Sequence, residues 1–496
     1  MRKYLVLLVA ALALVVFTMP AQAVDIKASG FYRSFFTLSN FHDGAGGPSL
    51  RDGVAEAEQT NAYVAQRFRI KWTVGSENVK AVWYLESDMN WGDSAGSTDA
   101  AATRNSGGAL GADKVQTETK QINVWFKVPD TSLEATVGLQ GIGDDYAGVF
   151  GATNDMAGVK IKGKYEPVSY YVVWAKLYEN EYRKTDDATL YMASVNFNPN
   201  KESQLGINFY VLQDDTGADA TEDTTSRRLR PGSAPDVTSP YADMTQDRKL
   251  LIYQPGVDGS IKVGPAKISG FFFYQFGKAK AASAAPANTP DIDVSGFAAD
   301  LRGDMNIGPG KVFLEGLYIS GDNNENDDNY DSIITLGDFQ RNASPGGYEG
   351  FSRTHMVMLL PTWNMASISQ CFIGCSGGWA GDSLGNGGRG AWVIAAGYNQ
   401  KFTDMLTGEV NVGYLAASDL YSFDESIGRD KDMGTEVNAT VTANIQKGLT
   451  VSLTGAYAWV GDFMKNESDP ATTPVTAGSE TFKDAWTSYV RVAYSY

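Results

Sequence analysis

The sequence predicts an all-β fold, a transmembrane antiparallel β-barrel of about eighteen strands, with sixteen as the alternative count. Segments of about ten residues alternate between apolar and polar side chains, and short turn signals join them in pairs. After the amino terminus, no stretch has the roughly 18 consecutive apolar residues that a membrane helix needs. A closed barrel is the other fold that pairs all backbone polar groups inside a membrane.

The amino terminus has the pattern of a secretory signal peptide. Arg2 and Lys3 precede an apolar run that ends near Phe17, and Ala21-Gln22-Ala23 fits an Ala-x-Ala cleavage site. We therefore expect residues 1–23 to be removed after Ala23 and residues 24–496 to form one outer-membrane barrel domain.

The segment Gln66–Val74 shows the alternation most clearly. Phe68, Ile70, Trp72 and Val74 fall on one face of a strand, and three cations with Thr73 fall on the other. A soluble sheet could solvate such a cationic face, so the segment alone leaves two readings open. Its recurrence along the chain favours an apolar face towards lipid and a cationic face towards a wet pore.

The same alternation predicts the other strands in chain order. Tight turns rich in Gly, Pro, Asn and Asp join eight pairs of them, because such residues stop strands. The expected strands are Ile26–Leu38, Gln66–Val74, Val79–Met89, Lys120–Val128, Leu133–Gly141, Ala157–Tyr165, Val168–Tyr178, Asp187–Phe197, Ser203–Gln213, Lys249–Val263, Ala266–Phe276, Ile292–Ile307, Lys311–Ser320, Trp392–Lys401, Leu406–Ala416, Gly434–Ile445, Leu449–Val460 and Ala485–Tyr496.

The connections are expected to differ at the two ends of the barrel, with short periplasmic turns and long extracellular loops. The stretch 321–390 is assigned to one long external loop. His355–Leu360 is apolar enough for a strand, but a turn near Pro361 has little support from its neighbours. The last strand ends on Tyr496, which resembles the C-terminal signature that the barrel-assembly machinery recognises.

Pore-lining residues are predicted from the polar faces of the strands. A luminal position is expected for the cations, because Arg or Lys facing lipid at mid-membrane costs about 2–4 kcal/mol. The basic candidates are Arg33, Arg67, Arg69, Lys71, Lys127, Lys160, Lys162, Lys164 and Lys176. A second, acidic or mixed wall is expected from Asp300, Arg302, Asp304, Glu315, Glu409 and Glu436.

The loop Ile142–Met156 is a candidate constriction. It holds Asp144, Asp145 and Asp155 among small residues, and the analogy is with trimeric porins, whose third external loop folds into the barrel. The alternative is a solvated surface loop. Together the two walls predict a mild preference for anions or weak selectivity.

Composition and charge limit the other classes of function. A net charge of −17, from 41 basic and 58 acidic residues, argues against nucleic acid as a partner. His42 and His355 are the two histidines, and neither lies in a catalytic or metal-binding pattern, so we expect no enzyme, cofactor or metal site. The acidic run Asp322–Asp328 could hold divalent cations, but a solvated loop is favoured. Cys371 and Cys375 are expected to form a local disulfide rather than a metal site.

Several segments resemble the homotrimeric outer-membrane porins of sulfate- and metal-reducing bacteria. They are Gln66–Arg69, Ser76–Ala81, Phe126–Pro129, Asp155–Val159 and Ile307–Gly310. The resemblance covers most of the first half and the last third of the chain. It implies a homotrimer of barrels in outer-membrane lipid and lipopolysaccharide, each barrel with its own pore for small hydrophilic solutes.

Three hypotheses for the function follow. The first is a porin for passive diffusion of small hydrophilic solutes and ions. The second is a solute-specific channel, selective for anions or carboxylates. A continuous series of cationic side chains along the lumen would favour this hypothesis. The third is a secreted adhesin or structural β-protein, whose cationic faces would lie on the outside and which would extract without detergent.

Overall fold

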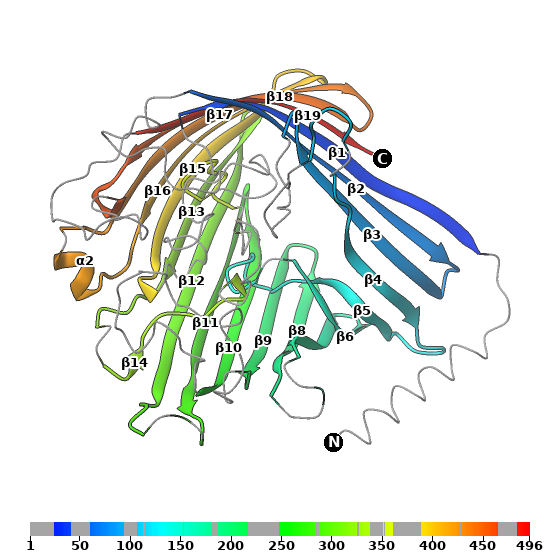
Figure 1. Ribbon diagram of the computed structural model, residues 1–496. Helices are drawn as coiled ribbons and strands as arrows, with labels where there is room; N and C mark the ends of the chain where they lie inside the picture. Colours follow the sequence, from blue (N-terminus) through cyan, green and yellow to red (C-terminus); the bar gives the residue numbers. More distant parts are fainter. Residues whose placement is uncertain are drawn as a thin grey trace.

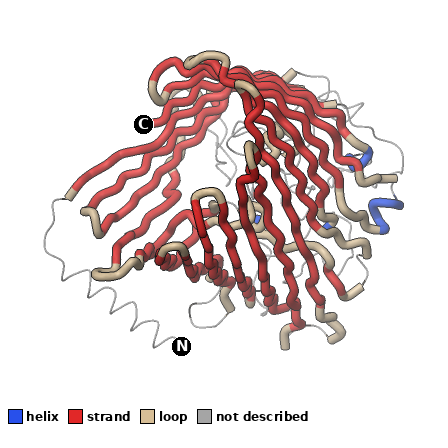
Figure 2. The backbone as a smooth tube through the Cα atoms, turned by 180° about the vertical axis from the view of Figure 1, so that it is seen from behind, coloured by secondary structure: helices blue, strands red, loops and turns tan. Residues whose placement is uncertain are grey.

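The computed structural model describes residues 24–40, 60–93, 107–112, 115–151, 153–179, 182, 186–216, 248–283, 285, 287–324, 327–337, 351, 353–360, 388–426, 428–464 and 484–496. Nineteen strands belong to one sheet, and eighteen of them close into an antiparallel barrel (Figure 1). The predicted fold class and strand count are therefore confirmed. Figure 2 shows the same wall from behind, with strands making up nearly all of the described backbone.

The strands alternate in direction around the wall, and each pairs with the next. The exception is β14, a two-residue strand that runs parallel to the start of β12 and is not part of the wall. The strands are β1 (Asp25–Ser39), β2 (Asn61–Gly75), β3 (Val79–Asn90), β4 (Glu118–Lys127), β5 (Glu134–Ile142), β6 (Asn154–Tyr165), β7 (Val168–Tyr178), β8 (Ala188–Asn200), β9 (Ser203–Asp214), β10 (Arg248–Val263), β11 (Ala266–Ala281), β12 (Ile292–Ile307), β13 (Gly310–Ile319), β14 (Asn329–Tyr330), β15 (Ala391–Lys401), β16 (Leu406–Ala416), β17 (Asp432–Gln446), β18 (Leu449–Val460) and β19 (Ala485–Ser495).

The first and last strands close the barrel. Phe31–Ser39 of β1 runs antiparallel to Thr487–Ser495 of β19. Gly30 and Tyr496 exchange two backbone hydrogen bonds, of 3.0 and 3.1 Å between N and O. Closure leaves no open sheet edge, which is what a membrane requires of a β-structure.

The two ends of the barrel differ as the sequence predicts. Short turns join β2 to β3, β4 to β5, β6 to β7 and each later pair, and both ends of the described chain lie on that side. The opposite end carries the long connections, including α2 (Ser422–Ser426) and the short 3-10 helix Asp462–Met464. We call them the short-turn end and the long-loop end. Within the described ranges, no helix is long and apolar enough to cross a membrane.

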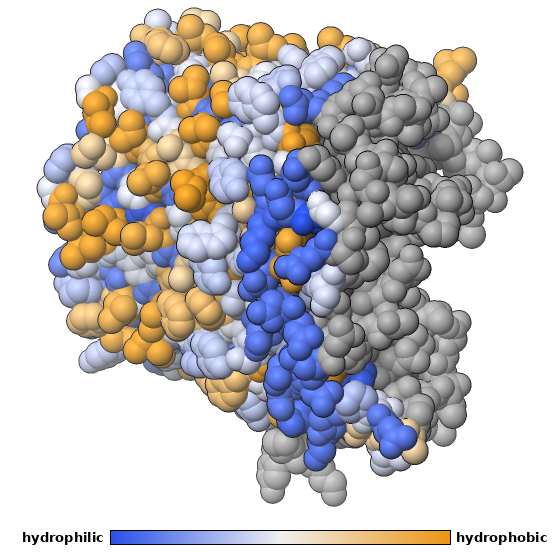
Figure 3. Space-filling view, turned by 90° about the vertical axis from the view of Figure 1, so that its left-hand side faces the viewer, coloured by the Kyte–Doolittle hydropathy of each residue, from blue (hydrophilic) through white to orange (hydrophobic). Residues whose placement is uncertain are grey.

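The outer wall is apolar and has aromatic side chains near both of its ends. Leu301 and Leu314, in the middle of their strands, are 64% and 61% exposed. Figure 3 shows many hydrophobic residues on one side of this wall, beside a strip of hydrophilic ones. Exposed aromatic residues near the short-turn end include Trp72, Trp83, Tyr165, Phe402 and Tyr494, and those near the long-loop end include Phe36, Trp91, Tyr274, Trp392 and Trp459. An apolar band between two aromatic girdles is typical of barrels that span a membrane.

Candidate pore and its lining

The cations of β2 lie on the inner face of the wall. Trp72 and Val74 are exposed on the outer face, whereas Arg69 is 8% exposed. The strand register carries this alternation to the neighbours, because residues opposite each other share a face. Arg33 of β1 lies opposite Arg67 of β2 and therefore also faces inwards.

Four arginines come together on the inner faces of three adjacent strands. Arg491 of β19 faces inwards beside β1, where it lies opposite Phe35 in register. Arg33 stacks over the ring of Phe31, with 4.1 Å from its Cζ to the ring centroid. Arg33, Arg67, Arg69 and Arg491 are called the basic wall below.

Carboxylates of β3 balance part of the basic wall. Asp88 accepts two hydrogen bonds from Arg67, of 2.8 and 2.7 Å. Glu86 forms an ion pair with Arg69 and lies 3.3 Å from Nε of Arg67. Such bidentate pairs hold guanidinium groups in a fixed orientation along the lumen.

The loop that follows β5 folds inwards and is organised by Asp144. Its carboxylate accepts backbone hydrogen bonds from Tyr146, Gly148, Phe150 and Gly151, with N···O distances of 2.8–2.9 Å. Burial raises the pKa of Asp144 to about 6, although these N–H donors act in the opposite direction. We call residues 143–151 the inner loop.

Aromatic packing fixes the inner loop against the barrel wall. Tyr146 and Phe150 are fully buried. The ring centroid of Tyr146 lies 4.7 Å from that of Phe273 and 5.4 Å from that of Tyr210. Gly256 of β10 makes room for this docking, because a Cβ there would lie 2.3 Å from the hydroxyl of Tyr146.

Asp145 is the polar contact of the same loop with the wall. Its Oδ2 accepts hydrogen bonds from the hydroxyls of Tyr171, at 2.5 Å, and Tyr210, at 3.0 Å. Lys160 lies over the ring of Tyr171, with its Nζ 4.6 Å from the centroid. The carboxylate of the inner loop therefore lies close to two phenols and an ammonium group of the wall.

A second segment, residues 331–336, folds inwards and meets the inner loop. The fully buried side chain of Gln275 donates to the carbonyl of Ile334 at 2.7 Å and accepts from its N–H at 2.8 Å. The N–H of Leu336 donates to the carbonyl of Phe150 at 2.7 Å. Two segments far apart in the sequence therefore form one layer inside the barrel.

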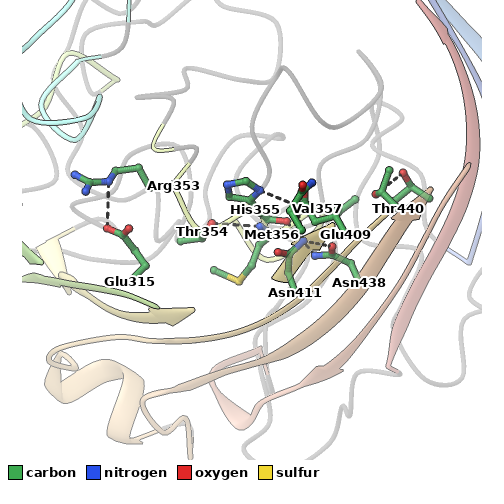
Figure 4. Close-up of polar contacts among 12 residues, drawn as sticks. Glu315, Arg353, Thr354, His355, Met356, Val357, Glu409, Asn411, Asn438 and Thr440 are labelled. Carbon is green, nitrogen blue, oxygen red and sulfur yellow. Dashed lines mark hydrogen bonds and ion pairs between the residues drawn. The ribbon is translucent and has the colours of Figure 1, made fainter. Parts of the chain in front are cut away.

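A third segment, residues 353–360, lies on the inner faces of β12, β13, β16 and β17 (Figure 4). Glu436 anchors it, because its carboxylate accepts hydrogen bonds from the N–H groups of Val357, Met358 and Leu359 at 2.6, 2.8 and 2.9 Å. Glu436 is fully buried. Met356 fits over Gly413, where a Cβ would lie 2.4 Å from its sulfur.

Ion pairs hold the same segment at its other end. Arg353 lies 2.8 Å from Asp300 and 3.4 Å from Glu315, measured from guanidinium nitrogen to carboxylate oxygen. Nδ1 of His355 lies 2.7 Å from Glu409. The stretch predicted as an external loop, 321–390, indeed supplies no strand of the wall among its described residues, but residues 331–336 and 353–360 lie inside the barrel. Residues 353–360 lie inside because buried carboxylates of the wall bind them and a glycine of the wall leaves room for their side chains.

The structure separates the predicted acidic residues into groups. Asp144 and Glu436 bind backbone N–H groups, and Glu315 and Glu409 hold the third segment. Asp155 pairs with Lys120 at 3.0 Å. The second, acidic wall is therefore covered by inward-folded chain.

The predicted lysines spread along the lumen instead of forming one cluster. Lys71 lies 6.0 Å from the ring centroid of Tyr84. Lys176 is the exception, and its predicted luminal position is wrong, because it lies opposite Ala157 and shares the outer face of β7 with the exposed Val172. It pairs with Glu179 and Asp187 at the long-loop end. Nearer the short turns are Lys127, 3.8 Å from Glu77, Lys162, 2.9 Å from Glu134, and Lys164, 2.6 Å from Glu166. The predicted disulfide of Cys371 and Cys375 lies outside the described residues.

Sequence reasoning missed the residues that fasten the inner segments. Arg353 and Tyr146 lie outside the strands and have no periodic signal of their own, and their partners Asp300 and Phe273 lie 53 and 127 residues away along the chain. Gln275 alternates with Tyr274 and Phe276, but its partner Ile334 is 59 residues away. Arg491 could have been found, since it alternates with Val490 and Val492 in the last strand.

One group of carboxylates has the spacing of a cation site. Oxygens of Glu179, Asp186 and Asp187 all lie within 4.8 Å of one another. The ammonium of Lys176 contacts Glu179 and lies 3.2 Å from Asp187. A lysine therefore already supplies positive charge to this group.

The class of structure defined so far is a closed eighteen-stranded barrel with three segments folded into it. No protein-family model matches the chain, and no curated protein matches it. Solved structures similar to it include three from Pseudomonas aeruginosa. OccK5 (OpdH) is 12% identical over 95% of this chain and 98% of that chain, with a TM-score of 0.46. OccK2 (OpdF) is 12% identical over 95% of this chain and 97% of that chain, with a TM-score of 0.49. OpdQ is 8% identical over 95% of this chain and 98% of that chain, also with a TM-score of 0.49. At these sequence identities and TM-scores, the similar structures indicate neither a solute nor an oligomeric state for this chain.

Proposed function

We propose that the protein is an outer-membrane channel for small hydrophilic solutes, with a preference for anions. The observation that carries the proposal is the division of the wall into an apolar outer face with aromatic girdles and a polar inner face with a run of arginines. In a membrane the first face contacts lipid and the second contacts water. A secreted adhesin is disfavoured, because its apolar residues would form a core.

The position of the inward-folded segments supports the anion preference. The inner loop and residues 331–336 and 353–360 cover the inner wall from β7 to β17, where their anchors are. The passage then runs beside β18, β19 and β1 to β6, along the basic wall. Glu315 and Glu436 on the covered side bind chain atoms, so they oppose the field of the arginines less than open carboxylates would.

The second candidate is a channel specific for carboxylates. Arg33, Arg67, Arg69 and Arg491 offer planar guanidinium groups on neighbouring strands, and such groups bind carboxylates through two parallel hydrogen bonds. A general pore would show currents proportional to solute concentration, whereas a specific one would saturate with a monocarboxylate such as benzoate.

Conductance in planar bilayers tests the proposal. The detergent-extracted mature chain should form pores whose reversal potential in a KCl gradient has the sign of anion preference. The double variant Arg33→Gln/Arg491→Gln should move that potential towards zero, and Lys249→Gln, on the outer face, should leave it unchanged. A chain that forms no pores, or that prefers cations, would overturn the proposal.

Assembly and targeting belong to the same proposal. We propose a homotrimer in outer-membrane lipid and lipopolysaccharide, delivered by the barrel-assembly machinery through the terminal Tyr496 after cleavage at Ala23. Conductance in steps of three and the mass of the detergent complex test the trimer. Removal of Tyr496 should lower the amount of assembled barrel.

A further inference from the structure

We infer that lysines around the short-turn mouth recruit anions and make conduction depend on the direction of the applied voltage. The inference rests on the proposed channel function and adds a second charged region, separate from the basic wall. It concerns six lysines, called the lysine collar: Lys27, Lys80, Lys162, Lys262, Lys267 and Lys311.

All six lie on the inner face close to the short turns. Lys27 shares the face of Arg33, and Lys80 lies opposite Gly75 at the last position of β2. Lys162 lies opposite Glu134, the first residue of β5. Lys162, Lys262 and Lys311 are 53–56% exposed, so their ammonium groups contact solvent at the mouth.

Two members of the collar lie directly opposite each other. Lys262 ends β10 and Lys267 begins β11, and the register pairs them. Like charges in this arrangement destabilise a sheet. Glu202 lies 3.1 Å from Lys262, and Asp304 lies opposite Lys267 while also pairing with Lys311 at 2.9 Å. The nearby acids are thus shared among more cations than they can neutralise.

The described residues near the long loops carry the opposite net charge. Carboxylates outnumber cations among its described residues, as in Asp327, Asp328 and Asp331, of which the last two are exposed. Among the described residues, cations therefore predominate on the inner face at the short-turn mouth and carboxylates predominate at the long-loop mouth.

Fixed charge at a mouth raises the local concentration of ions of the opposite sign. When the voltage drives anions in through the lysine collar, it also drives cations in through the acidic mouth, and both enter enriched. When the voltage is reversed, anions enter through the acidic mouth and cations enter through the lysine collar, so each ion enters where the fixed charge repels it. The current should therefore be larger when the short-turn side is negative.

Single-channel currents at both polarities in 0.1 M KCl test the inference. Orientation is read from Ser132→Cys, an exposed residue of a short turn, in a chain with Cys371 and Cys375 replaced by serine. A bulky membrane-impermeant maleimide then reports the side that the turns face. The expected ratio of the two currents is at least about 1.5, and it should approach one in 1 M KCl, where the Debye length is about 3 Å.

Variants separate the collar from the rest of the pore. Lys27→Gln/Lys262→Gln/Lys267→Gln should bring the ratio close to one while pores still form. The matched control Lys249→Gln/Lys280→Gln removes two outward lysines at the long-loop end and should keep the ratio of the parent. Equal currents in the parent, or an unchanged ratio in the collar variant, would overturn this inference and leave the channel itself intact. A chain without any current would overturn both.

Discussion

Glu436 is the residue whose replacement tests the inward-folded architecture most sharply. In Glu436→Gln, the carboxylate that accepts three backbone N–H groups and the side-chain amide of Asn438 becomes an amide with one accepting oxygen and one donating nitrogen. Val357 donates to Oε1, whereas Met358 and Leu359 donate to Oε2. Whichever way the amide is placed, at least one buried N–H faces another donor.

The magnitude follows from the cost of an unsatisfied buried donor, about 1–3 kcal/mol. That cost corresponds to about a 5- to 160-fold greater population of the undocked segment. Hydrogen exchange at the amides of residues 357–359 should accelerate by this factor. Single-channel currents should become noisier or larger, because the segment leaves the inner wall.

The matched control is Glu134→Gln, which removes an inner-face carboxylate that bonds Lys162 and Trp125 near the short turns. It should leave exchange at residues 357–359 unchanged. If Glu436→Gln also leaves exchange and current as they are, the docking of residues 353–360 on Glu436 is wrong.

Three further predictions follow from other contacts. Gly256→Ala places a methyl group 2.3 Å from a buried tyrosine hydroxyl and should cost about 1–3 kcal/mol in thermal unfolding; Gly303→Ala, with no atom within 4 Å of the new Cβ, is its control. Arg353→Gln leaves the buried carboxylate of Asp300 without its ion-pair partner, whereas Glu315 keeps Arg302 at 3.0 Å. The variant should increase channel noise, and the added change Asp300→Asn should partly reduce it again; equal noise in both variants would contradict this. Burial opposes ionisation of Asp424, yet two arginines hold its pKa below the ordinary value of about 3.9. The ion pairs of Asp424 therefore stabilise the fold fully above about pH 3.9, and this stabilisation is lost only as the pH falls through the lower pKa of the folded state. Hydrogen exchange at the backbone amides of α2 should therefore stay slow at pH 4.

The sequence predicted the wall well because each strand carries its own signal. The alternation of Phe68, Ile70 and Trp72 with cations is local, and turns such as Gly264-Pro265 mark where strands stop. The terminal strand was recognised by the same alternation, whereas its register with β1 comes from the structure. The count of eighteen strands followed from these local features.

The interior was harder to predict because its contacts join distant residues. Glu436 alternates like a pore-lining residue, but its role is set by residues 357–359, some 77 to 79 positions earlier. Asp144 likewise reads as a candidate constriction carboxylate, whereas it binds the backbone of its own loop. The period-two pattern shows which side chains face the interior of the barrel. It does not show whether water or a folded-in segment covers them.

The central claim is that the apolar side of each strand contacts lipid and the charged side contacts water in a pore. Single cysteines placed along residues 67–72, in a chain without its two native cysteines, test it directly with a small water-soluble thiol reagent in lipid vesicles. We expect labelling with period two, at 67, 69 and 71 and not at 68, 70 and 72. Labelling of positions 68, 70 and 72 instead, or of all six alike, would contradict the account.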